Sequence, residues 1–379
     1  EHTYALPLLK RRAFVQELTT KESRELLVSF DPVTRFRSAH RGPRRLVGPP
    51  LMRLAHPFAF ASLLKAIGAP SKRHFRAGGL PVYMDDPDAF VRESRAWAAF
   101  DSIAKAEGED FGWCVGQYVG ENGISEKLLQ RSERAPTLYR GLQELVRFSS
   151  SEASDLGLGI EERKDDVLLY TSYPSMRGAP GYMSSQGYQL PAYLFLIRHY
   201  LGMHWYPEEI GIEAKRVPKR AQVIFGGSRI RTGQERGYIS IPRAVLSTAA
   251  PDGIDLEQVA EIPPNNELSY ADRLRVLLRP YLAEGIPTKQ FAAELMDTSQ
   301  RTLQRRLRES RVSFRALLDE LHFAEAKDLL LTSQLSVSEI ADRVGYDDQA
   351  HFTRMFRRIG GICPSEFRRL GPRFESRAT

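Results

Sequence analysis

The apolar and polar positions near the C-terminus repeat one pattern twice, over residues 288–307 and 336–356. Each copy opens with a Ser or Thr that can cap a short helix, continues through a small residue and a turn, and closes with a second amphipathic helix. The pattern predicts two helix-turn-helix units, whose second helices are of a size that the DNA major groove admits. The matched pairs are Ala293 with Ala341, Met296 with Val344, Leu303 with Phe352, and Leu307 with Phe356.

Apolar periodicity also predicts a helix in front of each unit. Residues 270–283 form an amphipathic pattern that Gly285 and Pro287 end. Residues 314–331 form a second, continuous pattern, which as a helix would span about 27 Å. A rigid helix of that length can hold two recognition helices about 34 Å apart, which is one turn of DNA. One subunit could then read two successive major grooves.

The second helix of each unit carries a polar face suited to DNA. Ser299 is the expected cap of the first recognition helix, and Ser336 is the expected cap at the start of the second unit. Arg and Gln side chains offer bidentate hydrogen bonds to guanine and adenine edges. Such a face is often only solvated, but its position after a capped helix and a tight turn favours DNA binding. The expected outward residues are Gln300, Arg301, Gln304, Arg305 and Arg308 in the first unit, and Gln349, Ala350, His351, Thr353 and Arg354 in the second, with Arg357 and Arg358 as phosphate contacts.

Residues 52–250 show a different, mixed pattern. Helical spacing is found at 88–107, at 188–201 and in the stretch that Thr137 caps. Short apolar runs predict strands at 156–160, 167–173, 210–214, 221–225 and 237–241, the first two joined as a hairpin. We therefore expect an α+β N-terminal domain, followed by an all-α C-terminal domain with two helix-turn-helix units and a long linker helix.

Composition suggests where these domains begin and end. Residues 1–51 are rich in Arg and Pro with weak periodicity, which predicts a basic, flexible extension. Residues 251–268 contain a Pro-Pro-Asn-Asn run typical of a linker. The expected organisation is the extension, an effector-binding and dimerisation domain at 52–250, the linker, and a DNA-binding domain at 269–379.

The distribution of charged residues along the chain agrees with this domain organisation. The net charge is +7, so a polyanionic partner is plausible. Residues 10–76 contain 15 Lys and Arg against 4 Asp and Glu, and residues 270–379 contain 19 against 15. Residues 77–269 contain 20 against 27, so the middle of the chain is acidic and ill suited to DNA.

The cysteine and hydropathy patterns point to a cytoplasmic protein. Cys114 and Cys363 lie far apart in the chain, as expected of reduced thiols rather than of a disulfide framework. No apolar run approaches the roughly 18 residues of a membrane span, and no signal-peptide pattern opens the chain.

Candidate chemistry outside the DNA-binding units is sparse. His199 and His204 are five residues apart, which misaligns them on a helix, so we expect no metal site and no cofactor. The Gly-Gly-Ser-Arg stretch at 226–229 lacks the Lys-Ser/Thr of a phosphate loop and fits a turn better. Aromatic residues concentrate between 170 and 206. Packing accounts for most of them, but Tyr170, Tyr193 and Trp205 could line an effector pocket.

The C-terminal residues closely resemble the DNA-binding domain of AraC/XylS-family transcription regulators. The resemblance is carried by residues 335–346 and 352–358 and by Gly361, Pro364, Phe367 and Arg368. It places the base-reading positions on Arg301, Gln304 and Arg305 in the first unit and on Gln349, Ala350, His351 and Arg354 in the second. It leaves Ser299, Gln300, Arg308, Thr353, Arg357 and Arg358 as cap or phosphate contacts.

Three positions depart from the family pattern. Asp297 replaces a turn glycine, Arg311 stands where a glycine usually ends the helix, and Cys363 replaces a Ser or Thr cap. None of them removes a groove-facing residue. Residues 57–250 resemble, more weakly, the arabinose-binding-like effector domain of one branch of the family, through residues 135–138, Gly141-Leu142 and the Phe-Gly-Gly turn at 225–227.

The resemblance implies a ligand-responsive transcription regulator, expected to be an activator, with repression left open. Its expected partners are operator DNA, RNA polymerase, a small-molecule effector and a second copy bound through the N-terminal domain. Two alternatives remain at this stage. One is a metabolite-processing enzyme domain fused to a DNA-binding module, although no acid/base pair or cofactor motif supports it. The other is a structural nucleoid protein.

Overall fold

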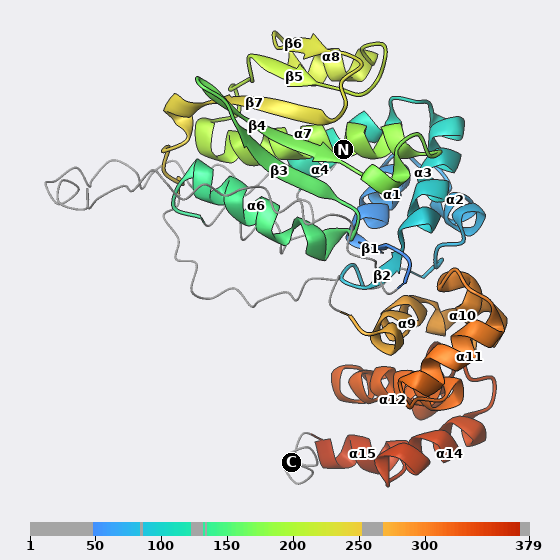
Figure 1. Cartoon of the computed structure of the whole chain (residues 1–379). Coiled ribbons are helices and arrows are strands. Elements are labelled where there is room, and N and C mark those ends of the chain that lie inside the picture. Colours follow the sequence, from blue (N-terminus) through green and yellow to red (C-terminus); the bar gives the residue numbers. More distant parts are fainter. Residues whose placement is uncertain (1–47, 84–85, 123–131, 133–134, 252–267, 372–379) are drawn as a thin grey trace, which may run out of the picture. The chain divides into compact units, whose positions relative to one another are not determined.

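A computed structural model describes residues 48–371, apart from 84–85, 123–131, 133–134 and 252–267. The basic extension at 1–51 and the linker at 251–268 fall almost entirely outside the described residues, so those expectations stay predictions. The described chain separates into an α+β region, up to residue 251, and a helical region, from residue 268 (Figure 1). This agrees with the fold class expected from the sequence.

A five-stranded sheet forms one layer of the α+β region. Its strand order is β3-β4-β7-β5-β6; the pairs are antiparallel except for β5 with β6. The predicted hairpin is β3 with β4, and Gly157 pairs with Ser172 at its open end. A separate antiparallel ribbon joins β1 and β2. The strands are β1 Leu51–Arg53, β2 Phe90–Arg92, β3 Gly157–Glu162, β4 Asp166–Ser172, β5 Glu209–Gly211, β6 Arg229–Arg231 and β7 Gly237–Pro242.

Helices pack against one face of this sheet. Alternation along β4 turns Val167 and Leu169 toward α6 and α7, which run beside the sheet in Figure 1. Leu168 and Tyr170 point to the opposite face, where they form a small cluster with Tyr238. The helices of the region are α1 Ala55–Ala66, α2 Ser71–Gly78, α3 Glu93–Glu107, α4 Phe111–Asn122, α6 Leu138–Glu152, α7 Tyr182–Leu201 and α8 Lys219–Phe225.

One predicted element of this region was wrong, and one helix starts later than expected. Residues 221–225 were expected to form a strand but lie in helix α8, because buried Ala221, Ile224 and Phe225 follow helical spacing in a run too short to decide from the sequence. The helix expected from residue 88 starts only at Glu93, after the short strand β2. Thr137 does cap α6, as expected: its side chain accepts a hydrogen bond from the Arg140 backbone.

The crossing of α4 and α7 is unusually close, and glycines make it possible. Gly112, Gly116 and Gly120 lie four residues apart along α4 and face α7. A Cβ added at Gly116 would lie 2.4 Å from the carbonyl oxygen of Tyr188, well inside contact distance. The two helices therefore pack backbone to backbone, which fixes the position of the middle of α7.

The helical region matches the predicted order of elements. The lead helix is shorter than expected, since α9 ends at Leu278 and a 3-10 segment, Arg279–Glu284, continues the chain. Helix α12 lies between the two helix-turn-helix units (Figure 1) and has 19 residues, which corresponds to about 28 Å. The helices are α9 Tyr270–Leu278, α10 Lys289–Leu295, α11 Gln300–Glu309, α12 Phe314–Thr332, α13 Val337–Arg343, α14 Gln349–Gly360 and α15 Pro364–Leu370.

Each helix-turn-helix unit has its own apolar core. The N-terminal half of α12 joins the core of the first unit through Leu317, and its C-terminal half joins that of the second through Ala326 and Leu330. The repeated positions Leu303 and Phe352 are both fully buried, one in each core. The shared helix therefore links two separately packed units, as the apolar repeat predicts.

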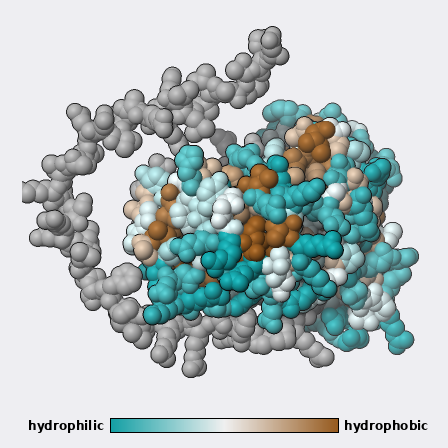
Figure 2. All heavy atoms as spheres, turned by 90° about the horizontal axis from the view of Figure 1, so that it is seen from above, coloured by the Kyte–Doolittle hydropathy of each residue, from teal (hydrophilic) through white to brown (hydrophobic). Residues whose placement is uncertain are grey.

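The outer surface is mostly hydrophilic on the face that Figure 2 shows, with small separate hydrophobic patches. Isolated apolar side chains of this kind are normal on protein surfaces. Among the described helices, none is both long and apolar enough to cross a membrane.

Candidate functional sites

The two helix-turn-helix units share one backbone design. Side-chain caps begin α10, α11 and α13 at Thr288, Ser299 and Ser336, where each hydroxyl accepts the backbone N–H three residues on. Ser336 also forms a capping box, since the Glu339 carboxylate accepts the Ser336 backbone N–H at 2.6 Å. Asp348 caps α14 by accepting the backbone N–H groups of Ala350 and His351. Both second helices therefore begin at fixed residues.

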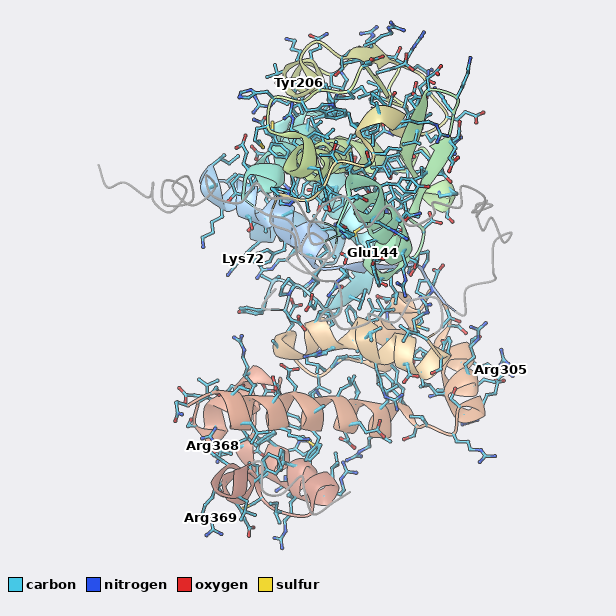
Figure 3. The ribbon with its side chains drawn as sticks, turned by 90° about the vertical axis from the view of Figure 1, so that its left-hand side faces the viewer. Lys72, Glu144, Tyr206, Arg305, Arg368 and Arg369 are labelled. Carbon is cyan, nitrogen blue, oxygen red and sulfur yellow. The ribbon has the colours of Figure 1, made fainter. Side chains whose placement is uncertain are left out.

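Helix α11 presents the polar face expected of the first unit. Leu303 and Leu307 are buried beneath it, while Gln300, Arg301, Arg305 and Arg308 are exposed and Gln304 is half-buried. In Figure 3 the Arg305 side chain points outward from its helix. Its guanidinium forms a 2.7 Å ion pair with Glu309, one turn along α11. Both side chains are exposed, so this pair is weak and leaves the arginine accessible on the outer face.

Helix α14 presents the corresponding face of the second unit. Phe352, Met355 and Phe356 are buried, so the opposite side faces solvent. Arg354 lies 3.9 Å from Asp348, too long for a strong pair at an exposed site. The exposed residues are Gln349, Ala350, His351, Arg354, Arg357 and Arg358, and Thr353 is half-buried.

Not every arginine of the helical region belongs to these faces. Arg306 lies over the ring of Tyr270, 5.0 Å from its centroid, so it points toward α9. Arg368 donates to the backbone carbonyls of Leu330 and Leu335, and ties α15 to the end of α12. These two side chains have structural roles, whereas the residues expected to read DNA lie on the open faces.

The α+β region contains a small, partly open cavity of about 30 Å³. Its apolar walls are Leu145, Leu156, Leu158 and Ala192. Its polar lining is Ser149 and Glu152 from α6, Tyr188, Gln189 and Tyr193 from α7, and His56 from α1. Such a mixture of apolar walls and a few converging polar groups is typical of small-molecule sites.

A buried ionic group lies at the polar end of this cavity. Glu152 is 1% exposed and forms an ion pair with Arg53, Nη1 to Oε1, at 3.2 Å. Its other oxygen lies 3.3 Å from His56 Nε2. Neither His56 Nε2 nor Glu152 Oε2 makes a hydrogen bond within the described part of the chain. The other ring nitrogen, His56 Nδ1, is 3.0 Å from the Tyr188 hydroxyl.

The phenols that line the cavity are neutral. Burial raises the pKa of Tyr188 above its ordinary value, and the negative charge of Glu152 raises it further. Burial also raises the pKa of Tyr193, although a hydrogen bond with Thr171 lowers that pKa in part. Both hydroxyls therefore keep their protons and can donate hydrogen bonds.

The structure does not bring together the three aromatic residues suggested for an effector pocket. Tyr193 lines the cavity, but Tyr170 lies on the opposite face of the sheet, beneath the Arg236 guanidinium. Trp205 is half-buried and packs against the edge of the core between α7 and the sheet. Side chains alternate along a strand, and this turns Tyr170 away from the sheet face that packs against α7, where Tyr193 lies. A cluster of aromatic residues in the sequence could not reveal that.

Sequence reasoning missed the polar residues of the cavity, His56, Glu152, Tyr188 and Gln189. Two of them carried a signal that could have been used: Glu152 ends an otherwise apolar helix face, and Gln189 interrupts a strongly apolar run. The described residues contain no group of three or more His, Cys, Asp or Glu side chains arranged to hold a metal ion.

Comparison with known proteins identifies the helical region. Residues 292–370 match a family model described as a helix-turn-helix domain. Over 146 residues the chain is 32% identical to an uncharacterized HTH-type transcriptional regulator of Mycobacterium tuberculosis, covering 37% of this chain and 42% of that relative. The chain thus spans less than half the length of that relative. Residues 292–370 therefore form an AraC-type helix-turn-helix domain.

Two further similarities extend over most of the chain. The HTH-type transcriptional regulator VirS of Mycobacterium tuberculosis is 24% identical over 346 residues, covering 85% of this chain and 97% of VirS. The crystal structure of transcriptional regulator CdpR from Pseudomonas aeruginosa is 16% identical and covers 83% of this chain and 98% of its own, with a TM-score of 0.38.

Proposed function

We propose that this chain, whose C-terminal region is an AraC-type helix-turn-helix domain, is a sequence-specific transcription regulator that responds to a small molecule. One observation carries the proposal: two capped helices, α11 and α14, each present an exposed polar face with arginines above a buried apolar face. Helix α12 packs into both units, so the two faces belong to one element that can bind a single duplex.

Within this proposal, the exposed arginines divide into two classes. Arg301, Arg305 and Arg354, with Gln304, Gln349, Ala350 and His351, read base edges in the major groove. Arg308, Arg357 and Arg358 contact phosphates together with Ser299, Gln300 and Thr353, and these contacts set the register without reading sequence. Tyr193 alone of the three suggested aromatics remains in the proposed effector site.

The α+β region supplies regulation in this proposal. It binds the effector and a second copy of the chain, and the bound effector favours one arrangement of the DNA-binding units because its affinity for the two states differs. The regulator acts mainly as an activator that contacts RNA polymerase, in the cytoplasm. Regulation rather than catalysis is proposed because the relatives are named as transcriptional regulators.

Selective binding by the full chain tests this function. Fluorescence anisotropy compares a labelled duplex from the chain's own promoter with a scrambled duplex of equal composition, between about 50 and 200 mM salt. We expect the promoter to bind about a thousandfold tighter. Equal affinity for the two duplexes would contradict the proposal and favour a structural nucleoid protein.

A further inference from the structure

The cavity in the α+β region has a marked charge character. Of its ten lining residues, all within the described chain, Glu152 is the only acidic side chain. The carboxylate shares its partner Arg53 with a second acid, Asp88, which also forms an ion pair with that guanidinium. Burial is the main cause that raises the pKa values of the Tyr188 and Tyr193 phenols, and the negative charge of Glu152 raises both further. No Lys or Arg is among the described lining residues to attract an anion into the cavity.

The position for a hydrogen-bond donor is also defined. Glu152 Oε2 and His56 Nε2 lie 3.3 Å apart, as an ion pair when the histidine is protonated, and neither atom makes a hydrogen bond in the described structure. A buried polar atom without a partner is unfavourable, and a carboxylate oxygen can only be satisfied by a donor. When the Tyr188 hydroxyl accepts from His56 Nδ1, the Nε2 atom is also an acceptor. An ammonium group has three donors and can satisfy both.

The remaining walls limit the rest of the ligand. Leu145, Leu156, Leu158 and Ala192 offer no polar partner, so the body of the ligand must be apolar. A cavity of about 30 Å³ has room for roughly two water molecules. That volume limits the ligand to a chain of about two carbons beside its polar head group.

We propose that this cavity binds a small primary alkylammonium ion, with its nitrogen between Glu152 and His56 and its carbon chain against the leucine wall. The inference rests on the proposed function, since it names the chemical class of the effector. It assigns the recognition of charge to Glu152, held in place by Arg53, and the recognition of shape to α6 and α7.

Calorimetric titration of the full chain in phosphate buffer tests the ligand class. The probes are ethylamine hydrochloride, ethanol and sodium acetate, which share a two-carbon skeleton and differ in the charge of the head group. We expect saturable binding of the amine at millimolar concentration, binding of the alcohol weaker by about tenfold to a hundredfold, and no binding of acetate. Equal binding of amine and alcohol, or no binding of the amine, would overturn the proposal.

Two variants locate the site. Glu152→Gln keeps the shape and removes the charge, and it should weaken amine binding by about tenfold or more. Glu144→Gln removes a carboxylate from the outer part of the same helix, labelled in Figure 3, and should bind as the parent does. If Glu152→Gln fails to fold by circular dichroism, Ala192→Leu decides, because the added carbons fill the cavity. Unchanged amine affinity in the folded variant would refute the site.

The DNA measurement separates this inference from the proposed function. A chain that prefers its promoter but binds no amine remains a regulator, and only the ligand class is wrong. A chain that binds the amine without preferring its promoter keeps the cavity assignment and loses the regulator function.

Discussion

Asp297 and Gly345 occupy equivalent positions in the two helix-turn-helix units, and both adopt the left-handed backbone conformation, with φ of 52° and 83°. In both units the next residue donates its backbone N–H to the carbonyl five residues earlier, at 2.9 Å. The turns are therefore built alike, although only the second uses the residue that tolerates this conformation without steric cost.

The same conformation recurs at Arg311, which follows the C-cap Ser310 of α11 and has a φ of 57°. Because a side chain disfavours left-handed backbone, Arg311→Gly should stabilise the chain by about 1 kcal/mol. Urea unfolding followed by circular dichroism measures the change. Ala324→Gly, at an exposed position inside α12, is the matched control and should cost about 1 kcal/mol. A loss of stability in Arg311→Gly would show that its side chain contributes more than the strain costs.

The exposed arginines should fall into two functional groups. Arg305→Ala and Arg354→Ala should each weaken promoter binding by about 1–3 kcal/mol and relax the preference at one base pair, because a base-edge contact is lost. Arg357→Ala should weaken binding to promoter and scrambled DNA equally. It should also reduce the slope of log affinity against log salt concentration by about one. Anisotropy on single-base-pair variants of the promoter distinguishes them. Uniform weakening by Arg305→Ala would make that residue a phosphate contact.

The close crossing of α4 and α7 gives a stability prediction. Gly116→Ala places a methyl group 2.4 Å from the Tyr188 carbonyl oxygen, so the helices must separate. We expect a loss of about 1–3 kcal/mol in the free energy of unfolding. Gly227→Ala, where a new Cβ would meet nothing within 4 Å, should leave it nearly unchanged. Equal effects in denaturant titration would argue against tight packing at the crossing.

Buried His322 predicts how stability depends on pH. Burial lowers its pKa from 6.5 to about 4 in the folded chain, so the unfolded chain binds the proton more tightly. Stability from this group is present above pH 6.5 and is lost as the pH falls toward 4. Between pH 7 and pH 5 the loss should be about 2 kcal/mol.

The His322→Gln variant isolates that contribution. Denaturant unfolding of the parent and the variant at both pH values gives the difference directly, since the other histidines are common to both chains. The parent should lose about 2 kcal/mol more than the variant. Equal losses of unfolding free energy in the parent and the variant would mean that His322 can be protonated in the folded chain without cost.

The double helix-turn-helix could be predicted from sequence because its signals are local. Caps at Thr288, Ser299 and Ser336, and apolar spacing of three and four residues, each act within one or two turns of helix. Local signals failed where a short apolar run fits either period: residues 221–225 form a helix because burial of Ile224 and Phe225 on the core decided it.

What the sequence determined by itself was therefore the order of helices in the last hundred residues, their inward and outward faces, and the arginine-bearing surface that follows from them. Only the tertiary structure decided the cavity, because His56, Glu152 and Tyr188 come from three helices far apart along the chain. No periodicity links such residues. They meet because α6 and α7 bury their apolar faces against one sheet, and the α4 glycines fix the position of α7.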